Sequence, residues 1–102
     1  MPSFESTTNN ELAPEAGTGL DEVGGYRVTW YFAFDAVRKR PYLTRELCIR
    51  VVECPDRVQV QSDGRVRFWA ILDEFEGRAL RVITLPDRKT IHNAFLDRRF
   101  KP

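Results

Sequence analysis

The chain has 102 residues, 42% of them hydrophobic and 12% aromatic, which is enough for one folded domain with a modest core. No apolar run approaches the roughly 20 residues of a membrane span, and the acidic N-terminus lacks the apolar core of a signal peptide, so a cytoplasmic protein is expected. The formal net charge is +1, and 13 of the 16 basic residues are Arg, which suits bidentate contacts with phosphate or carboxylate.

The N-terminal segment differs in composition from the rest of the chain. Residues 1–22 carry five acidic side chains and no Lys or Arg, which leaves a charge of +6 on residues 23–102. This composition predicts a disordered or loosely ordered acidic tail over residues 1–24 and a single domain over residues 25–102. The tail is either a plain solvated end or an acidic arm that covers the basic body and mimics a polyanion.

The first ordered element is predicted to be a helix over Tyr26–Arg40, with Thr29 as a candidate N-cap. Tyr26–Trp30 alone would also suit a short strand. Pro41 ends the helix because it cannot continue the hydrogen-bond ladder. The expected buried stripe follows helical spacing and consists of Trp30, Ala33, Phe34 and Val37.

A second helix is predicted to start at the N-cap Thr44 and to end at Pro55-Asp56. Its apolar stripe contains Leu47, Cys48, Val51 and Val52. The two cysteines, Cys48 and Cys54, point in different directions on one helix and are expected to be free thiols. No second cysteine pair and no pair of His at ligand spacing is present, so neither a metal site nor a cofactor is expected.

From Arg57 onward the apolar period changes to two, which is typical of strands. Four strands are expected, at residues 57–61, 66–73, 80–85 and 90–95. The last two form a hairpin around the turn Pro86-Asp87-Arg88-Lys89, in which proline presets φ and Asp87 supports the bend. The prediction is therefore an α+β fold, in which two N-terminal helices pack on a four-stranded antiparallel meander sheet.

The sheet face that the helices leave open carries the candidate catalytic residues. If Phe68, Leu80 and Val82 face the helices, Arg67 and Arg81 project from the open face. Arginine can hold phosphate, and His92, the only histidine, can transfer a proton. For each of the three there is an ordinary alternative: a solvated strand face for Arg67, an ion pair for Arg81 and a hydrogen bond within the sheet for His92.

Other residues are candidates for nucleic-acid binding alone. The indole of Trp69 could stack on a base, or could simply cover apolar surface. The remaining candidates are the cations of the hairpin turn and of the C-terminal segment, which otherwise form solvated surface: Arg88, Lys89, Arg98 and Arg99.

Three short motifs resemble a family. These are Pro41-Tyr42-Leu43-Thr44 at the helix turn, Gly77-Arg78-Ala79-Leu80-Arg81-Val82 in the third strand and Ile91-His92-Asn93-Ala94-Phe95 in the fourth. Residues 30–100 resemble the RelE- and BrnT-like ribonuclease toxins and small bacterial domains related to them. Those domains carry His-Ala in the first helix, where this chain has Asp35-Ala36, so His92 would have to replace that histidine.

Three functional hypotheses follow. The first, implied by the resemblance, is a toxin-like, metal-independent endoribonuclease that acts on RNA through His92, Arg81 and Arg67 and is neutralised by an acidic antitoxin-like protein. The second is a non-catalytic module of the same fold that binds nucleic acid or a protein. The third is an interaction protein whose acidic tail docks elsewhere. Turnover separates the first from the others, and salt-dependent nucleic-acid affinity separates the second from the third.

Overall fold

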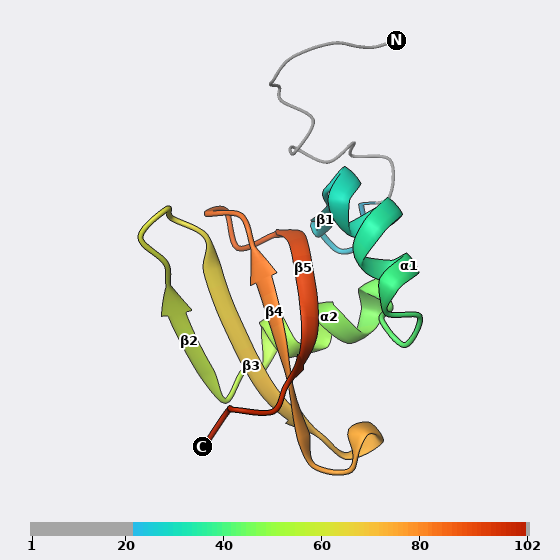
Figure 1. Cartoon of the computed structure of the whole chain (residues 1–102). Helices are drawn as coiled ribbons and strands as arrows, with labels where there is room; N and C mark the ends of the chain where they lie inside the picture. Colours follow the sequence, from blue (N-terminus) through green and yellow to red (C-terminus); the bar gives the residue numbers. More distant parts are fainter. Residues whose placement is uncertain (1–21, 102) are drawn as a thin grey trace, which may run out of the picture.

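The computed structural model describes residues 22–101 (Figure 1). Of the predicted tail over residues 1–24, only residues 22–24 fall within this part, and Val23 pairs there with Tyr26 in an isolated bridge. The elements in chain order are β1 (Arg27–Val28), the π-helical turn η2 (Phe32–Ala36), α1 (Val37–Lys39), α2 (Arg45–Glu53), β2 (Arg57–Val60), β3 (Val66–Leu72), the 3₁₀ turn η3 (Asp73–Phe75), β4 (Arg78–Thr84) and β5 (Thr90–Asp97).

The sheet has five strands in the order β1-β5-β4-β3-β2 and is mixed. The prediction of a four-stranded antiparallel sheet under two N-terminal helices is therefore wrong. Strands β2 to β5 pair antiparallel, but β1 adds to the free side of β5 in parallel, with Arg27 opposite Thr90 and Val28 opposite Ile91. The backbone N–H of Thr29 extends this pairing by donating to the carbonyl of Ile91 at 3.0 Å.

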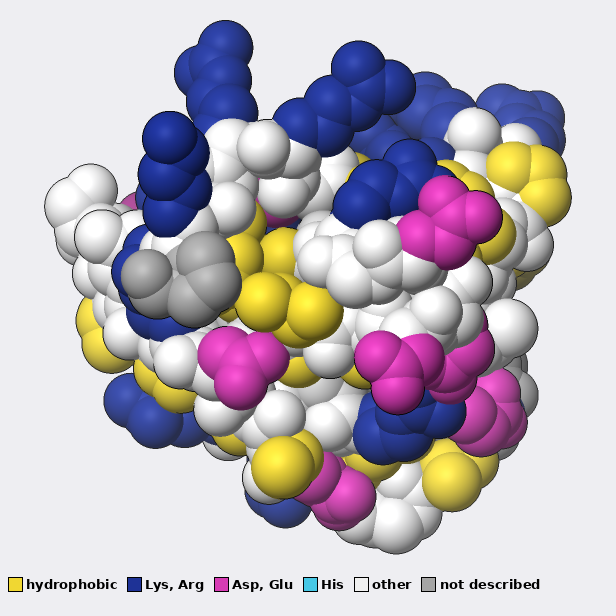
Figure 2. Space-filling view, turned by 90° about the horizontal axis from the view of Figure 1, so that it is seen from below, with side chains coloured by type: hydrophobic (Ala, Val, Ile, Leu, Met, Phe, Trp, Pro, Cys, Tyr) yellow, Lys and Arg dark blue, Asp and Glu magenta, His cyan; other side chains and the backbone are white. Residues whose placement is uncertain are grey.

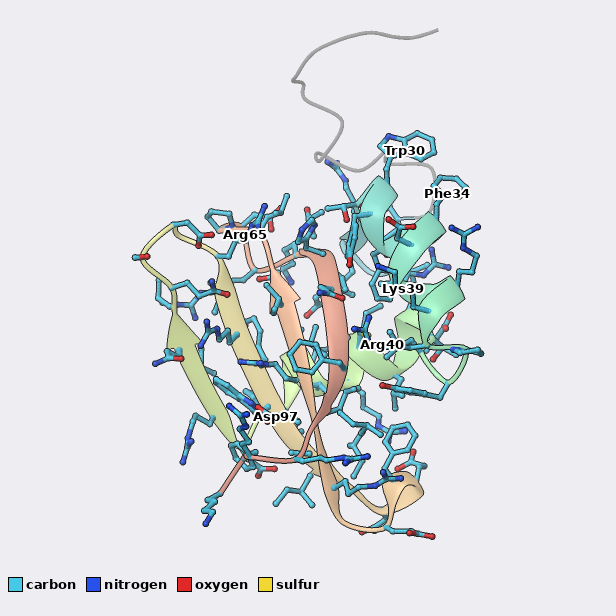
Figure 3. The ribbon with its side chains drawn as sticks, in the orientation of Figure 1. Trp30, Phe34, Lys39, Arg40, Arg65 and Asp97 are labelled. Atoms are coloured by element: carbon cyan, nitrogen blue, oxygen red, sulfur yellow. The ribbon has the colours of Figure 1, made fainter. Side chains whose placement is uncertain are left out.

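The first helical segment is shorter than predicted and buries a different face. It runs over residues 30–39, and Thr29 caps it by accepting a hydrogen bond from the N–H of Phe32 at 3.1 Å. The buried side chains are Phe32 and Ala36. The expected stripe is wrong because Trp30 and Phe34 are 43% and 60% exposed and stack on each other on the outer side of the segment (Figure 3).

The helices and the sheet form two layers, with the core between them. Figure 1 shows α2 crossing one face of the sheet, while the other face carries no helix. Helix α2 begins after Thr44, whose hydroxyl accepts from the N–H of Leu47, and it buries Cys48 and Val51. The sheet side chains in the core alternate along β3 and β4, as a half-covered sheet requires, whereas a bulge in β5 separates its two core residues by three positions. These core side chains are Val66, Phe68, Ala70, Leu72, Leu80, Val82, Ile91 and Ala94.

The hairpin between β4 and β5 closes around the predicted turn. The N–H of Arg88 donates to the carbonyl of Leu85 at 2.9 Å, which places Pro86 second in the turn. One oxygen of Asp87 accepts from the backbone N–H groups of Lys89 and Thr90, and the other accepts from the Thr90 hydroxyl. The expectation that Asp87 supports the bend is confirmed.

Both cysteines are free, with Cys48 buried and Cys54 exposed, as expected. Within residues 22–101, no helix has the length and apolar character that crossing a membrane would need.

Candidate nucleic-acid interface

The register fixes which side chains share the open face of the sheet. Arg67 pairs with Ile83, and Trp69 pairs with Arg81. Arg81 in turn lies opposite Phe95, so Trp69, Arg81 and Phe95 form a row across three strands. Arg67 is the diagonal neighbour of Arg81, at a spacing of about 7 Å between such positions. The two arginine candidates therefore lie side by side, as expected from the sequence.

Arg81 is the centre of this row. Its guanidinium carbon lies 4.3 Å from the centroid of the Phe95 ring and 5.7 Å from that of Trp69. Its Nε lies 3.7 Å from Oδ2 of Asp97, which is an ion pair but not a hydrogen bond, and this Nε is buried without a hydrogen-bond partner among the described residues. Burial lowers the pKa of Arg81 and the nearby charge of Arg67 lowers it further, whereas Asp97 raises it.

Trp69 has no free ring face on which a base could stack. Its side chain is 6% exposed, and Phe100 stacks on the indole with 5.8 Å between centroids. The indole N–H donates to Asp97 at 2.9 Å. The guanidinium of Arg57 covers Phe100 in turn, at 4.7 Å. The half-buried rings that border solvent on this face are consequently Phe95 and Phe100, which the sequence analysis did not select.

Arg67 lines a polar hollow of about 250 Å³ together with Gln59, Val60, Gln61 and Ser62. Its Nη1 donates to Oε1 of Gln59 at 3.1 Å, and its Nε is buried without a hydrogen-bond partner among the residues described. An unpartnered buried donor costs about 1–3 kcal/mol. Arg67 and Arg81 therefore present two incompletely satisfied guanidinium groups on one face.

His92 does not join these arginines in one row. It is the extra residue of a bulge in β5, between the pairs Ile83–Asn93 and Thr84–Ile91. Its Nδ1 is hydrogen-bonded to the hydroxyl of Thr29 at 3.1 Å, and its ring packs on Tyr31. These contacts hold the imidazole against the start of the first helical segment, while the arginines project from the open face.

The other candidate cations lie at the two ends of β5. Arg88 and Lys89 are exposed in the turn before it, with the Lys89 ammonium 4.4 Å from the Tyr26 ring centroid. Arg98 and Arg99 follow it and are exposed. Seen from below, many of the basic side chains stand along the upper margin of the molecule and others lie at its left and lower sides, while most of the acidic ones lie in the lower half of the view (Figure 2).

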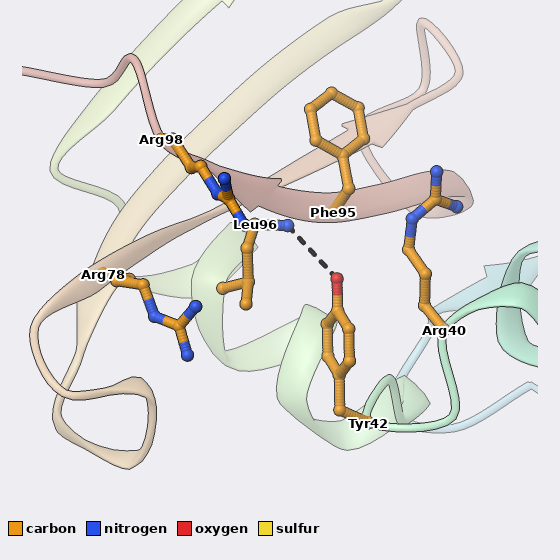
Figure 4. A pocket seen from close by; sticks show the side chains of 6 residues that line it. All are labelled: Arg40, Tyr42, Arg78, Phe95, Leu96 and Arg98. Atoms are coloured by element: carbon orange, nitrogen blue, oxygen red, sulfur yellow. Dashed lines mark hydrogen bonds between the residues drawn. The ribbon is translucent and has the colours of Figure 1, made fainter.

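A second basic site borders the edge of β5. It is an open pocket of about 500 Å³ lined by Arg40, Tyr42, Arg78, Phe95, Leu96 and Arg98 (Figure 4). Only Arg98 among these was predicted from the sequence, because the others meet only once the path of the chain past β5 is known. We name this site the β5-edge pocket.

Among the residues described, no group of three His, Cys, Asp or Glu side chains could hold a metal ion. The chain matches no family model, and neither a curated protein nor a solved structure is significantly similar to it. The resemblance to the RelE- and BrnT-like toxins therefore stays a prediction, and the proposals below depend on the geometry of the chain itself.

Proposed function

We propose that this chain is a nucleic-acid-binding module that holds single-stranded RNA across the open face of its sheet. The observation that carries the proposal is the neighbouring pair Arg67 and Arg81. Arg81 forms an ion pair with Asp97, whereas Arg67 forms none with a carboxylate of residues 22–101, so the positive charge of the pair is only partly balanced. A phosphate beside them would supply negative charge that balances the two guanidinium groups.

The aromatic side chains of the same face suit the bases. Phe95 is half-buried between two arginines, Arg81 at 4.3 Å and Arg40 at 5.6 Å. Rings and guanidinium planes both stack on nucleobases without strong sequence preference, at about 1–3 kcal/mol per base. Phe100 packs on Trp69 and is covered by the Arg57 guanidinium, so a base at this position would stack on that guanidinium plane. Single strands fit this face better than a duplex does, because stacking needs unpaired bases.

The test is the salt dependence of binding to a fluorescent single-stranded RNA, measured by anisotropy. Each phosphate contact on a single strand contributes about 0.7 to the slope of log K against log salt. We expect Arg67→Gln and Arg81→Gln each to lower that slope by about 0.7 and to weaken binding by about tenfold or more, which corresponds to the loss of one charge-assisted hydrogen bond.

Arg38→Gln is the matched control, because it removes the same charge from a helix side chain that is 81% exposed and paired with Asp35. It should leave the slope unchanged. Equal losses in all three variants would indicate a nonspecific effect of net charge, and no binding by the folded protein would remove the proposal.

The endoribonuclease hypothesis needs its own measurement. Incubating the same RNA with the protein in EDTA, and repeating this with His92→Ala, tests metal-independent cleavage; general acid–base catalysis contributes about 10²–10⁴-fold. The contacts of His92 with Thr29 and Tyr31 favour binding over catalysis, since they turn the imidazole away from the arginine pair. The cytoplasmic location and the acidic antitoxin-like partner stay predictions.

A further inference from the structure

The β5-edge pocket combines three cations with no anion among the described residues. Figure 4 shows Arg40 on one side of Tyr42, and Arg78 and Arg98 on the other. None of the three arginines forms an ion pair within residues 22–101. Arg40 lies over Phe95, and its Nη1 is buried without a hydrogen-bond partner in this part of the chain. No carboxylate of residues 22–101 therefore balances the positive charge of the pocket.

The backbone beside the pocket is also incompletely paired. Strand β1 covers only Thr90 and Ile91 of β5. Further along the same edge, the N–H of Leu96 donates to the hydroxyl of Tyr42 at 3.3 Å, which is a long bond to an exposed side chain. A polar segment lying along this edge could bond to the backbone as well as to the arginines.

We propose that the β5-edge pocket binds acidic side chains of the chain's own residues 1–21, Glu11 and Glu15 foremost. Residues 1–21 contain four acidic side chains and no Lys or Arg. The carboxylates supply a negative charge that balances Arg40, Arg78 and Arg98. Each carboxylate can accept two parallel hydrogen bonds from one guanidinium group.

The length of the segment permits this contact within one molecule. Val23 is bridged to Tyr26, directly before β1, so residue 22 lies near the start of β5. From Thr90 to Leu96 the strand rises by roughly 20 Å. Glu15 lies seven residues before Glu22 and can extend up to about 25 Å from it, and Glu11 farther. A tether of this length gives the carboxylates an effective concentration in the millimolar range.

A spin label tests the contact in the full chain. Asn10→Cys, in a background with Cys54→Ser, provides one reactive thiol beside Glu11, because Cys48 is buried. We expect the label to broaden the amide resonances of Leu96 and Arg98 selectively. Arg78→Gln with Arg98→Gln should abolish the broadening, whereas Arg57→Gln with Arg67→Gln, which removes the same charge from the open face, should not. Salt at about 0.5 M, where the Debye length is only about 4 Å, should also abolish it.

Broadening spread evenly over the basic surface, or unchanged by Arg78→Gln with Arg98→Gln, would overturn the proposal. Contact between copies is measured in a mixture of two kinds of chain: one carries the spin label without isotope enrichment, and the other is isotope-enriched and carries no spin label. Selective broadening at Leu96 in that mixture would assign the pocket to the segment of a second copy and would equally overturn the intramolecular contact.

If the open face binds RNA as proposed above, residues 1–21 would regulate that binding. Phe95 belongs both to the pocket and to the RNA-binding face, so a segment in the pocket would compete with RNA. Replacing Glu5, Glu11 and Glu15 by Gln should then raise RNA affinity about two- to fivefold. The spin-label measurement needs no RNA, so failure of RNA binding and failure of the pocket contact would be seen separately.

Discussion

Asp97 accepts a hydrogen bond from the indole N–H of Trp69, with 2.9 Å between Nε1 and Oδ2. This bond, together with the N–H of Arg99 and the charge of Arg81, holds the pKa of Asp97 below its ordinary value. The pKa of Asp87 is also lowered: burial alone would raise it, but the hydroxyl of Thr90 and two backbone N–H groups outweigh burial.

The two carboxylates predict how stability depends on pH. Both pKa values are lower in the folded than in the unfolded chain, so their stabilisation is complete above the unfolded value of about 4 and is lost as pH falls through the folded values. We expect the urea midpoint to decline below about pH 4, and to decline less steeply in Asp97→Asn. If the pH profile of Asp97→Asn were identical to that of the unaltered protein, protonation of Asp97 would not contribute to the loss of stability.

The turn before β5 should depend strongly on one side chain. Asp87 accepts three hydrogen bonds, whereas Asp63, in the turn before β3, accepts one, from the N–H of Arg65. Asp87→Ala should lower the free energy of unfolding by about 2 kcal/mol, and Asp63→Ala by about 0.5–1 kcal/mol. Urea denaturation of both variants measures the difference, and equal losses would contradict the assignment.

The first helical segment offers a direct check on which of its faces is buried. Phe32 is 2% exposed, and Phe32→Ala should cost about 3–5 kcal/mol of unfolding free energy. Phe34 is 60% exposed and contacts Trp30 on the outside, so Phe34→Ala should cost less than about 1 kcal/mol. Thermal or urea unfolding gives both values. A larger loss for Phe34→Ala would support the face that was predicted from the sequence.

The two thiols should react at very different rates. Burial raises the pKa of Cys48 to about 12, so almost no thiolate forms at neutral pH, whereas Cys54 is exposed. A thiol reagent should modify one cysteine of the native protein rapidly and the second only after unfolding. Mass spectrometry of the modified peptide should locate the fast site at Cys54, and rapid modification of both would show that α2 opens readily.

Local chemistry predicted several features correctly. The turn at Pro86-Asp87 follows from the φ of proline and from the side chain of Asp87. The burial of Cys48 follows from the spacing of the apolar residues in α2, and the shared face of Arg67 and Arg81 follows from strand alternation. Each of these features depends on residues close in sequence or on one period that holds throughout an element.

The wrong predictions from the sequence also have physical causes. In η2 the N–H of Val37 bonds to the carbonyl of Phe32, five residues back, so the 3.6-residue period does not hold there and the buried face shifts from Phe34 to Phe32 and Ala36. Strand β1 lies within Tyr26–Trp30, which the sequence allowed as a short strand, but its parallel pairing depends on the distant β5 and has no local signal. Without β1, neither the environment of His92 nor the β5-edge pocket could be anticipated.

The parallel pairing of β1 with β5 also constrains how the chain folds. Thr29 and His92 are hydrogen-bonded across 63 positions of sequence, so this contact closes a loop that contains both helices and the other three strands. We expect such a closure to be entropically costly and to follow the formation of the local hairpins. During synthesis β1 is made before Thr90 and Ile91, so the first strand of the sheet in the sequence can pair only after the start of the last strand has been made.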